Sequence, residues 1–147
     1  MFRVLMDIII SEVVDLDIID KISNNLFLKK LFPDGLSEPI YLGQIRFDVE
    51  GRLTLNFHTK KKPSVEIAKW GTWGKDYNVI VITVNGLCRD SAILKNIKDA
   101  DYAQLIIADS TDTFTISQVG SNWSIEIECT TFIFQDFFCR DFFSTIP

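Results

Sequence analysis

The chain has 147 residues but little of what most catalytic and metal-binding sites require. It holds one histidine, His58, whereas zinc sites commonly need several His or Cys ligands and acid–base catalysis most often uses histidine. Its seven glycines form neither G-x-G-x-x-G nor G-x-x-x-x-G-K, the loops that hold phosphate groups. We therefore expect no enzyme, no catalytic residue, no metal and no cofactor. The alternation around His58 predicts a solvated side chain on the polar side of a strand.

Cysteine and long hydrophobic runs are also scarce. Cys88, Cys129 and Cys139 show no Cys-x-x-Cys spacing, which predicts free, buried or half-buried thiols in a reducing cytoplasm. Near the N-terminus the longest uncharged apolar run is Ile8-Ile9-Ile10, whereas a bilayer span needs about 20 residues. Because no small-residue cleavage site follows, we expect neither a secretion signal nor a membrane anchor. Residues 2–10 could form a strand or a helix.

Acidic residues outnumber basic ones, and the two kinds are unevenly distributed. The net charge is −5, made up of −4 over residues 1–20, +5 over residues 21–75 and −6 over residues 76–147. This balance argues against nucleic acid as a partner, because acidic surfaces repel phosphates. The acidic second part would instead speed association with a basic protein.

The hydrophobic pattern predicts one mainly β domain over residues 1–147. Residues 15–32 place apolar side chains at helical spacing, and Pro33-Asp34-Gly35 ends that pattern. Ser23 or Asn24 could cap a short helix over residues 26–32. From residue 39 the period becomes two. We therefore expect a minor N-terminal helical or extended segment (residues 1–38) packed on an antiparallel meander (39–147), forming a β-sandwich or a partly open barrel.

The first hairpin has a register that can be argued from its turn. A three-residue loop, Val49-Glu50-Gly51, places glycine where a left-handed conformation is needed. Phe47 then opposes Leu53, Ile45 opposes Leu55, and the apolar rows share one face. The same register sets Asp48 against Arg52 as a favourable charge pair.

The rest of the chain contains further predicted strands. Residues 77–84 are apolar on both faces, which indicates a central strand that Asn85-Gly86 should end. Residues 92–97 could form one helical turn, and residues 105–108 a short strand. A two-residue turn at Gly120-Ser121 would then set Ile116 against Ile125 and Phe114 against Ile127 in a second hairpin.

Two aromatic segments have open interpretations. Residues 58–75 interleave lysines with tryptophans, as in some single-strand nucleic-acid binders, but a surface loop whose Trp70 packs on the sheet is favoured. Residues 132–143 hold six of the twelve phenylalanines. They predict closing strands of an aromatic core, while an exposed aromatic patch for a partner is the alternative.

The order of these motifs resembles bacterial immunity protein family 50, which accompanies polymorphic toxins. The resemblance rests on IYLGQIRFDVEGRLTLNFHT, a linker ending in Lys69-Trp70, YNVIVITVNG, LIIADS, TFTISQ and WSIEIECTTFIFQ, and it covers residues 36–140. It implies stoichiometric inhibition of a cognate toxin in the cytoplasm, the toxin being an enzyme such as a basic nuclease. A small apolar-ligand-binding β protein, using the Phe-rich end as its pocket, is the alternative.

We expect the toxin-binding surface among acidic and aromatic residues of the second part of the chain. Acidic side chains attract a basic partner, and aromatic side chains often contribute much of the binding energy of an interface. The candidates are Trp73, Asp99, Asp101, Asp109, Asp112, Glu126 and Glu128.

Overall fold

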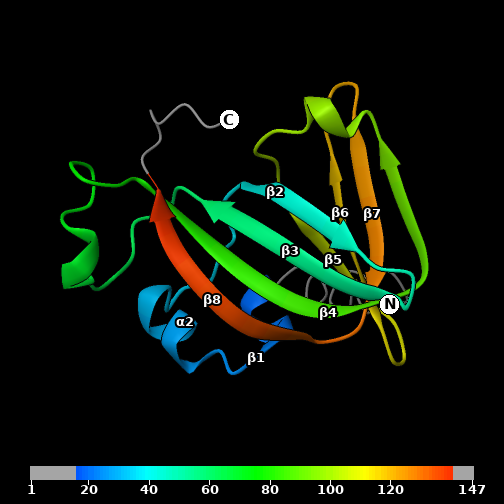
Figure 1. Cartoon of the computed structure of the whole chain (residues 1–147), viewed down its shortest axis with the longest axis horizontal. Coiled ribbons are helices and arrows are strands. Elements are labelled where there is room, and N and C mark those ends of the chain that lie inside the picture. Colours follow the sequence, from blue (N-terminus) through cyan, green and yellow to red (C-terminus); the bar gives the residue numbers. More distant parts are fainter. Residues whose placement is uncertain (1–15, 141–147) are drawn as a thin grey trace, which may run out of the picture.

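The computed structural model describes residues 16–140, which form one strongly curled, mostly antiparallel sheet of eight strands with a minor helical part (Figure 1). The predicted β class is confirmed, and the curled sheet makes a half-barrel. The predicted elements at residues 2–10 and the last phenylalanines, Phe142 and Phe143, lie outside the described residues. The strands are β1 (Ile22–Ser23), β2 (Ile40–Phe47), β3 (Arg52–Thr59), β4 (Val79–Lys95), β5 (Ile106–Asp109), β6 (Phe114–Val119), β7 (Ser124–Cys129) and β8 (Phe132–Arg140).

The long strand β4 belongs to both halves of the sheet. Its first part lies between β3 and β8, and its last part pairs with β7, which continues to β6 and β5. A bulge between Cys88 and Ala92 separates the two parts, and Asp90 has a positive φ of 28° there. The strand therefore bends away from β3 and carries the sheet around the core.

The predicted end of this strand at Asn85-Gly86 is wrong. Gly86 stays in the strand, and a Cβ there would lie 2.7 Å from the Phe132 ring. The absence of a side chain at Gly86 therefore lets the ring pack closely against the strand. In the sequence, the same Asn-Gly pair looks like a turn. The predicted helical turn at residues 92–97 is also wrong, because residues 92–95 continue β4 and a 3-10 helix, η3, covers only Ile97–Asp99.

The N-terminal part contributes buried side chains to the same core. A 3-10 helix, η1 (Ile18–Lys21), precedes β1, and α2 (Leu26–Leu31) follows it, so the helical pattern forms two short helices. Asn25, not Ser23 or Asn24, is the N-cap of α2, and it makes no side-chain capping bond. The end at Pro33-Asp34-Gly35 is confirmed, since α2 stops before it. The fully buried residues of this part are Ile18, Ile19, Ile22, Leu28, Leu31 and Phe32.

The first hairpin has the predicted register. Phe47 opposes Leu53 and Ile45 opposes Leu55, while Gly51 takes a left-handed φ of 89°. The Arg52 Nε lies 3.1 Å from a carboxylate oxygen of Asp48, which confirms the predicted charge pair.

The second hairpin has a different register from the predicted one. Ile116 opposes Ile127 and Phe114 opposes Cys129, because residues 120–123 form a four-residue loop instead of a two-residue turn. A shift of two residues keeps every side chain on its face, so alternation alone could not distinguish the two registers. The loop is set by Trp123, which is 7% exposed and packs against Gly120.

We expect Gly120→Ala to destabilise the protein by about 1–3 kcal/mol, the usual cost of overpacking. A Cβ at this position would lie 1.9 Å from the indole Nε1 of Trp123, and that ring is buried. Urea denaturation of Gly120→Ala beside Ser121→Ala, an exposed position in the same loop, measures the effect. Equal midpoints for the two variants would contradict the proposed packing.

Candidate functional site

The most distinctive surface is the outer face of the half of the sheet formed by β5, β6, β7 and the end of β4. On β7 the side chains of Ile125 and Ile127 point into the core, so those of Glu126 and Glu128 point away from it. We call this surface the acidic face. Its members are Ile93, Ile106, Thr115, Ser117, Glu126 and Glu128.

The register fixes the neighbours of the two carboxylates. Glu126 is exposed, and it stands between Ile93 of β4 and Ser117 of β6. Glu128 is half-buried, opposes Thr115, and accepts a 3.3 Å hydrogen bond from the Thr113 hydroxyl. The face thus presents two carboxyl groups among short polar and aliphatic side chains, a surface suited to a cationic partner.

Four further predicted acids lie at the two ends of the same half. Asp99 closes η3 and accepts a 2.9 Å hydrogen bond from the Asn122 side chain in the β6–β7 loop. Asp101 follows closely in sequence and binds the backbone N–H of Tyr102 at 2.8 Å. At the opposite end, Asp109 is ion-paired with Lys21, and the exposed Asp112 sits in the β5–β6 turn.

Trp73 does not join these acids. It lies in the loop before β4, where its ring packs edge-on against Tyr77 at 5.4 Å. That loop and the β5–β7 half lie on opposite sides of the molecule (Figure 1). The structure therefore brings the six acids to one half of the sheet and leaves the tryptophan in the other.

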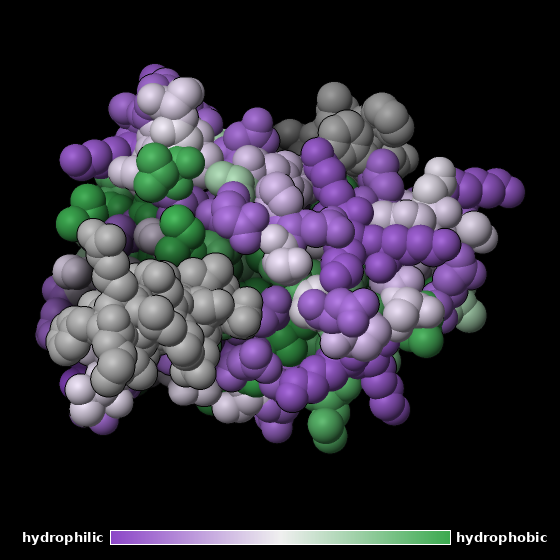
Figure 2. Space-filling view, turned by 180° about the vertical axis from the view of Figure 1, so that it is seen from behind, coloured by the Kyte–Doolittle hydropathy of each residue, from purple (hydrophilic) through white to green (hydrophobic). Residues whose placement is uncertain are grey.

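The uneven charge along the sequence becomes a charge separation in space. Residues 88–130, which form the last part of β4 and all of β5–β7, carry seven Asp or Glu against three Lys or Arg, a net charge of −4. The basic stretch of residues 21–75 forms instead β1, α2, β2, β3 and the loop after β3, and Lys21 at its start is ion-paired with Asp109 of the acidic half. Hydrophilic side chains dominate the side shown in Figure 2, with hydrophobic ones gathered toward the β5–β7 end.

The prediction of a solvated His58 is wrong. The side chain is only 6% exposed; its ring packs edge-on against Tyr41 and lies where a Cβ on Gly43 would be. Burial, followed by the positive charge of Arg140, lowers the pKa of His58 to about 4. The imidazole is therefore neutral at pH 7. It fills the space beside the bulge of β2, where Gly43 has no side chain.

The outer face of the other half carries chains of side-chain hydrogen bonds. The Thr83 hydroxyl donates to Asn56 at 2.9 Å, and the Asn56 amide donates to Gln44 at 3.1 Å. A second chain lies beside it, running from Thr54 through Asn85 to Gln135 at 2.8 and 2.6 Å. Because these groups bind one another, they contribute mainly to strand registration.

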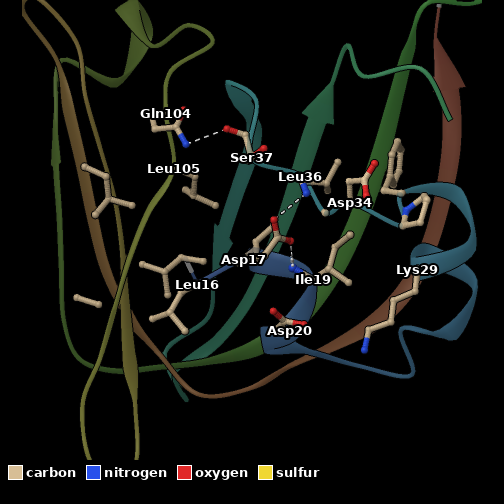
Figure 3. A pocket seen from close by; sticks show the side chains of 17 residues that line it. Leu16, Asp17, Ile19, Asp20, Lys29, Asp34, Leu36, Ser37, Gln104 and Leu105 are labelled. Carbon is tan, nitrogen blue, oxygen red and sulfur yellow. Dashed lines mark hydrogen bonds between the residues drawn. The ribbon is translucent and has the colours of Figure 1, made fainter. Parts of the chain in front are cut away.

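A groove lies between η1, residues 33–37 and β5 (Figure 3). Its volume is about 970 Å³, and Asp17 stands at its centre. Both Asp17 carboxylate oxygens are occupied, by the N–H groups of Ile19 at 3.0 Å and Leu36 at 2.8 Å. Asp17 therefore ties two chain segments together. The remaining lining is partly apolar and includes Leu16 and Leu105.

The aromatic segments take the favoured interpretations within the described residues. Trp70 packs on Tyr77 and Phe137, as the surface-loop prediction requires. Phe132 is fully buried in β8, whereas Phe138 remains 44% exposed. Phe134 and Phe137 are half-buried against the core, so β8 contributes one fully buried and two half-buried phenylalanine rings to it. No residue of β8 lines the groove between η1, residues 33–37 and β5.

All three cysteines are free thiols, as predicted. Cys129 is buried, and burial together with the nearby Cys88 and Glu128 raises its pKa to about 12. Burial also raises the pKa of the half-buried Cys88 and Cys139. At neutral pH these side chains are therefore protonated and serve as small apolar groups.

No protein-family model, curated protein or solved structure matches this chain. Within residues 16–140, no helix is long and apolar enough to cross a membrane. The same residues contain no group of three or more His, Cys, Asp or Glu arranged to hold a metal ion.

Sequence reasoning found Glu126 and Glu128 but missed Ile93, which stands beside them. Residues 91–95, Ser-Ala-Ile-Leu-Lys, do not alternate between apolar and polar side chains, and all five are exposed, so this part of β4 carries no period-two signal. The Asn85-Gly86 pair also looked like the end of the strand.

Proposed function

We propose that this chain is an immunity protein that binds and neutralises a cognate bacterial toxin in the cytoplasm by stoichiometric inhibition. The observation that carries the proposal is the acidic face, where Glu126 and Glu128 are displayed on a rigid sheet. A nuclease must attract phosphates and therefore has a cationic substrate groove, to which such a face is complementary. Occupying that groove would block the substrate without any chemistry by the inhibitor.

The placement of the family-like motifs supports the proposal. The first motif forms the β2–β3 hairpin, the apolar segment from Tyr77 forms the first part of β4, and the later ones form β5, β6, β7 and β8. The segments on which the resemblance rests thus become strands of one sheet. These segments therefore belong to one folded unit and not to separate ones.

Co-expression with the product of the neighbouring upstream gene tests the function. If that product poisons the cell, this chain should restore growth, and the purified proteins should form a one-to-one complex. A complex burying more than about 1,000 Å² is expected for a stable inhibitor. Failure both to restore growth and to bind would overturn the proposal.

Charge reversal tests the acidic face. We expect Glu126→Lys combined with Glu128→Lys to slow toxin association by about tenfold or more at low ionic strength, because steering depends on charge complementarity. The difference should shrink at about 0.5 M salt, where screening is strong. Stopped-flow or surface plasmon resonance measures the rate.

The matched control for this experiment is Glu38→Lys combined with Asp136→Lys. Both residues are exposed and lie outside the acidic face, and the change in net charge is the same. Equal association rates for the two double variants would show that total charge, and not this face, steers the toxin.

A second candidate function, binding of a small apolar ligand, is favoured by the groove beside η1. The dye 1-anilinonaphthalene-8-sulfonate, an anion whose aromatic rings bind apolar sites, provides a direct probe of this groove. Binding that is lost in Leu105→Asp, on the groove wall, but kept in Val49→Asp, at the exposed β2–β3 turn, would support this function. Absence of dye binding would exclude a preformed apolar site there.

A further inference from the structure

Two of the three cysteines lie directly opposite each other where the two halves of the sheet meet. Cys88 of β4 is the register partner of Cys129 of β7, although 41 residues separate them in the sequence. Both side chains point to the inner side of the sheet, since Cys129 belongs to the buried core and Cys88 packs against it. In Figure 1, β7 reaches β4 at this bend. The fold therefore brings together two thiols that no sequence motif pairs.

Backbone hydrogen bonds define the kind of pair that the two cysteines form. The Cys88 N–H donates to the Gly51 carbonyl at 2.7 Å and is therefore directed away from β7. The Thr130 N–H, next to Cys129, donates to the carbonyl of Leu87, next to Cys88, at 3.0 Å. This pattern marks a non-hydrogen-bonded antiparallel pair, in which the Cα atoms lie about 4.5 Å apart. Disulfides join residues whose Cα atoms are about 4.4–6.8 Å apart, so the pair meets this requirement at its short end.

The two thiols also lean in the same direction. The Cys88 Sγ donates to the Ser91 carbonyl at 3.6 Å, and the Cys129 Sγ donates to the Ile127 carbonyl at 3.5 Å. Because the strands are antiparallel, the residues after Cys88 and those before Cys129 lie at the same end of the pair. Both sulfur atoms therefore lie toward the bulge of β4. We infer that Cys88 and Cys129 form a reversible intramolecular disulfide, a redox-sensitive site at the junction of the two halves.

The oxidant that this site takes is a small-molecule disulfide such as oxidised glutathione. Cys88 is half-buried and Cys129 is buried, so the first attack comes from Cys88. Its thiolate bonds to one sulfur of the small disulfide and releases the other half as a thiol, which leaves a mixed disulfide. The Cys129 thiolate then bonds to the Cys88 sulfur and releases the second small thiol. The two released thiols carry the two electrons and two protons that the cysteines lose.

The bond would fasten the acidic half to the bend of β4. The residues between the two cysteines form the last part of β4, the strands β5 and β6, and most of β7. Closing a loop of this length stabilises a protein mainly by restricting its unfolded chain. We expect the oxidised protein to melt about 5–10 °C above the reduced one.

The Cys139→Ser variant, which keeps only Cys88 and Cys129, measures formation of the bond. Burial, with the charges of Glu128 and Asp90, raises the pKa of Cys88, so the reaction is run at about pH 8.5. With about 5 µM protein and about 5 mM oxidised glutathione, the mass should fall by two hydrogens with no glutathione retained. Dithiothreitol should restore both the original mass and the lower melting temperature.

The matched control is Cys88→Ser, which also keeps two cysteines but not an opposed pair. Cys139 opposes Ile80, eight residues before Cys88 on β4 and about 26 Å away along the strand. This variant should form no internal disulfide and should retain glutathione on Cys139. An unchanged mass of Cys139→Ser, glutathione retained on its Cys88, or equal bond formation in the two variants would overturn the inference.

Peptide mapping of the unaltered chain provides a second measurement. In the folded protein the bond should join Cys88 to Cys129. In about 8 M urea it should instead join mainly Cys129 to Cys139, because that pair closes the shortest loop. The same bond pattern in both conditions would show that the fold does not select the pair, and would count against the inference. None of these results depends on a toxin, so toxin binding and disulfide formation are tested separately.

Discussion

Phe132→Ala should lower the free energy of unfolding by about 3–5 kcal/mol, the usual cost of removing a fully buried phenylalanine. Phe132 is 0% exposed, and its ring meets Phe57 of β3 edge-on at 6.1 Å and Phe114 of β6 at 5.4 Å. It therefore links the two halves of the curled sheet. Because a domain of this size is stable by only about 5–15 kcal/mol, the loss would remove a large part of the total.

Phe138→Ala is the matched control for this prediction. It removes the same side chain from the same strand, but Phe138 is 44% exposed, so the expected loss is about 1 kcal/mol or less. Guanidinium denaturation of both variants gives the comparison. Similar losses at the two positions would mean that Phe132 does not hold the halves together.

The second large effect is a loss of stability on acidification caused by His58. Its pKa is about 4 in the folded chain, whereas an unperturbed histidine has a pKa of 6.5, so the unfolded state binds more protons between these values. Stability should be full above pH 6.5, fall as the pH decreases toward 4, and then stop changing from this source. The difference of about 2.5 units corresponds to about 3 kcal/mol.

His58→Gln isolates this contribution from that of the carboxylates. The free energy of unfolding, measured by urea denaturation between about pH 4.5 and pH 7, should depend less steeply on pH in the variant, by nearly one proton around pH 5. Tyr41, which contacts the ring, and Arg140, whose charge disfavours protonation, are unchanged in this comparison. Parallel curves for the two proteins would show that His58 titrates normally.

Local chemistry explains why some predictions succeeded. The β2–β3 hairpin was predictable because its register depends on four neighbouring features: Gly51, the Asp48–Arg52 pair and two apolar rows. All of them lie within a short stretch of chain. The acidic character of residues 88–130 was equally visible, because charge requires no knowledge of contacts.

Non-local packing explains the failures. Gly86 looked like a turn, but its lack of a side chain makes room for the ring of Phe132, which lies 46 residues further along the chain. His58 looked solvated because it alternates with apolar residues, but Gly43, in the bulge of the neighbouring strand β2, leaves a space that its ring fills. In both cases a residue far away in the sequence determined the role of the local one.

The sequence by itself determined the β class, the first hairpin and the separation of charge along the chain, because period, turn chemistry and composition are local properties. Only the tertiary structure showed that β4 belongs to both halves of the sheet. That single arrangement gathers the acids on one half, places Ile93 beside Glu126, and sets Cys88 opposite Cys129. The reason is physical: strand pairing and ring packing join residues far apart in sequence, and no local pattern encodes which of them meet.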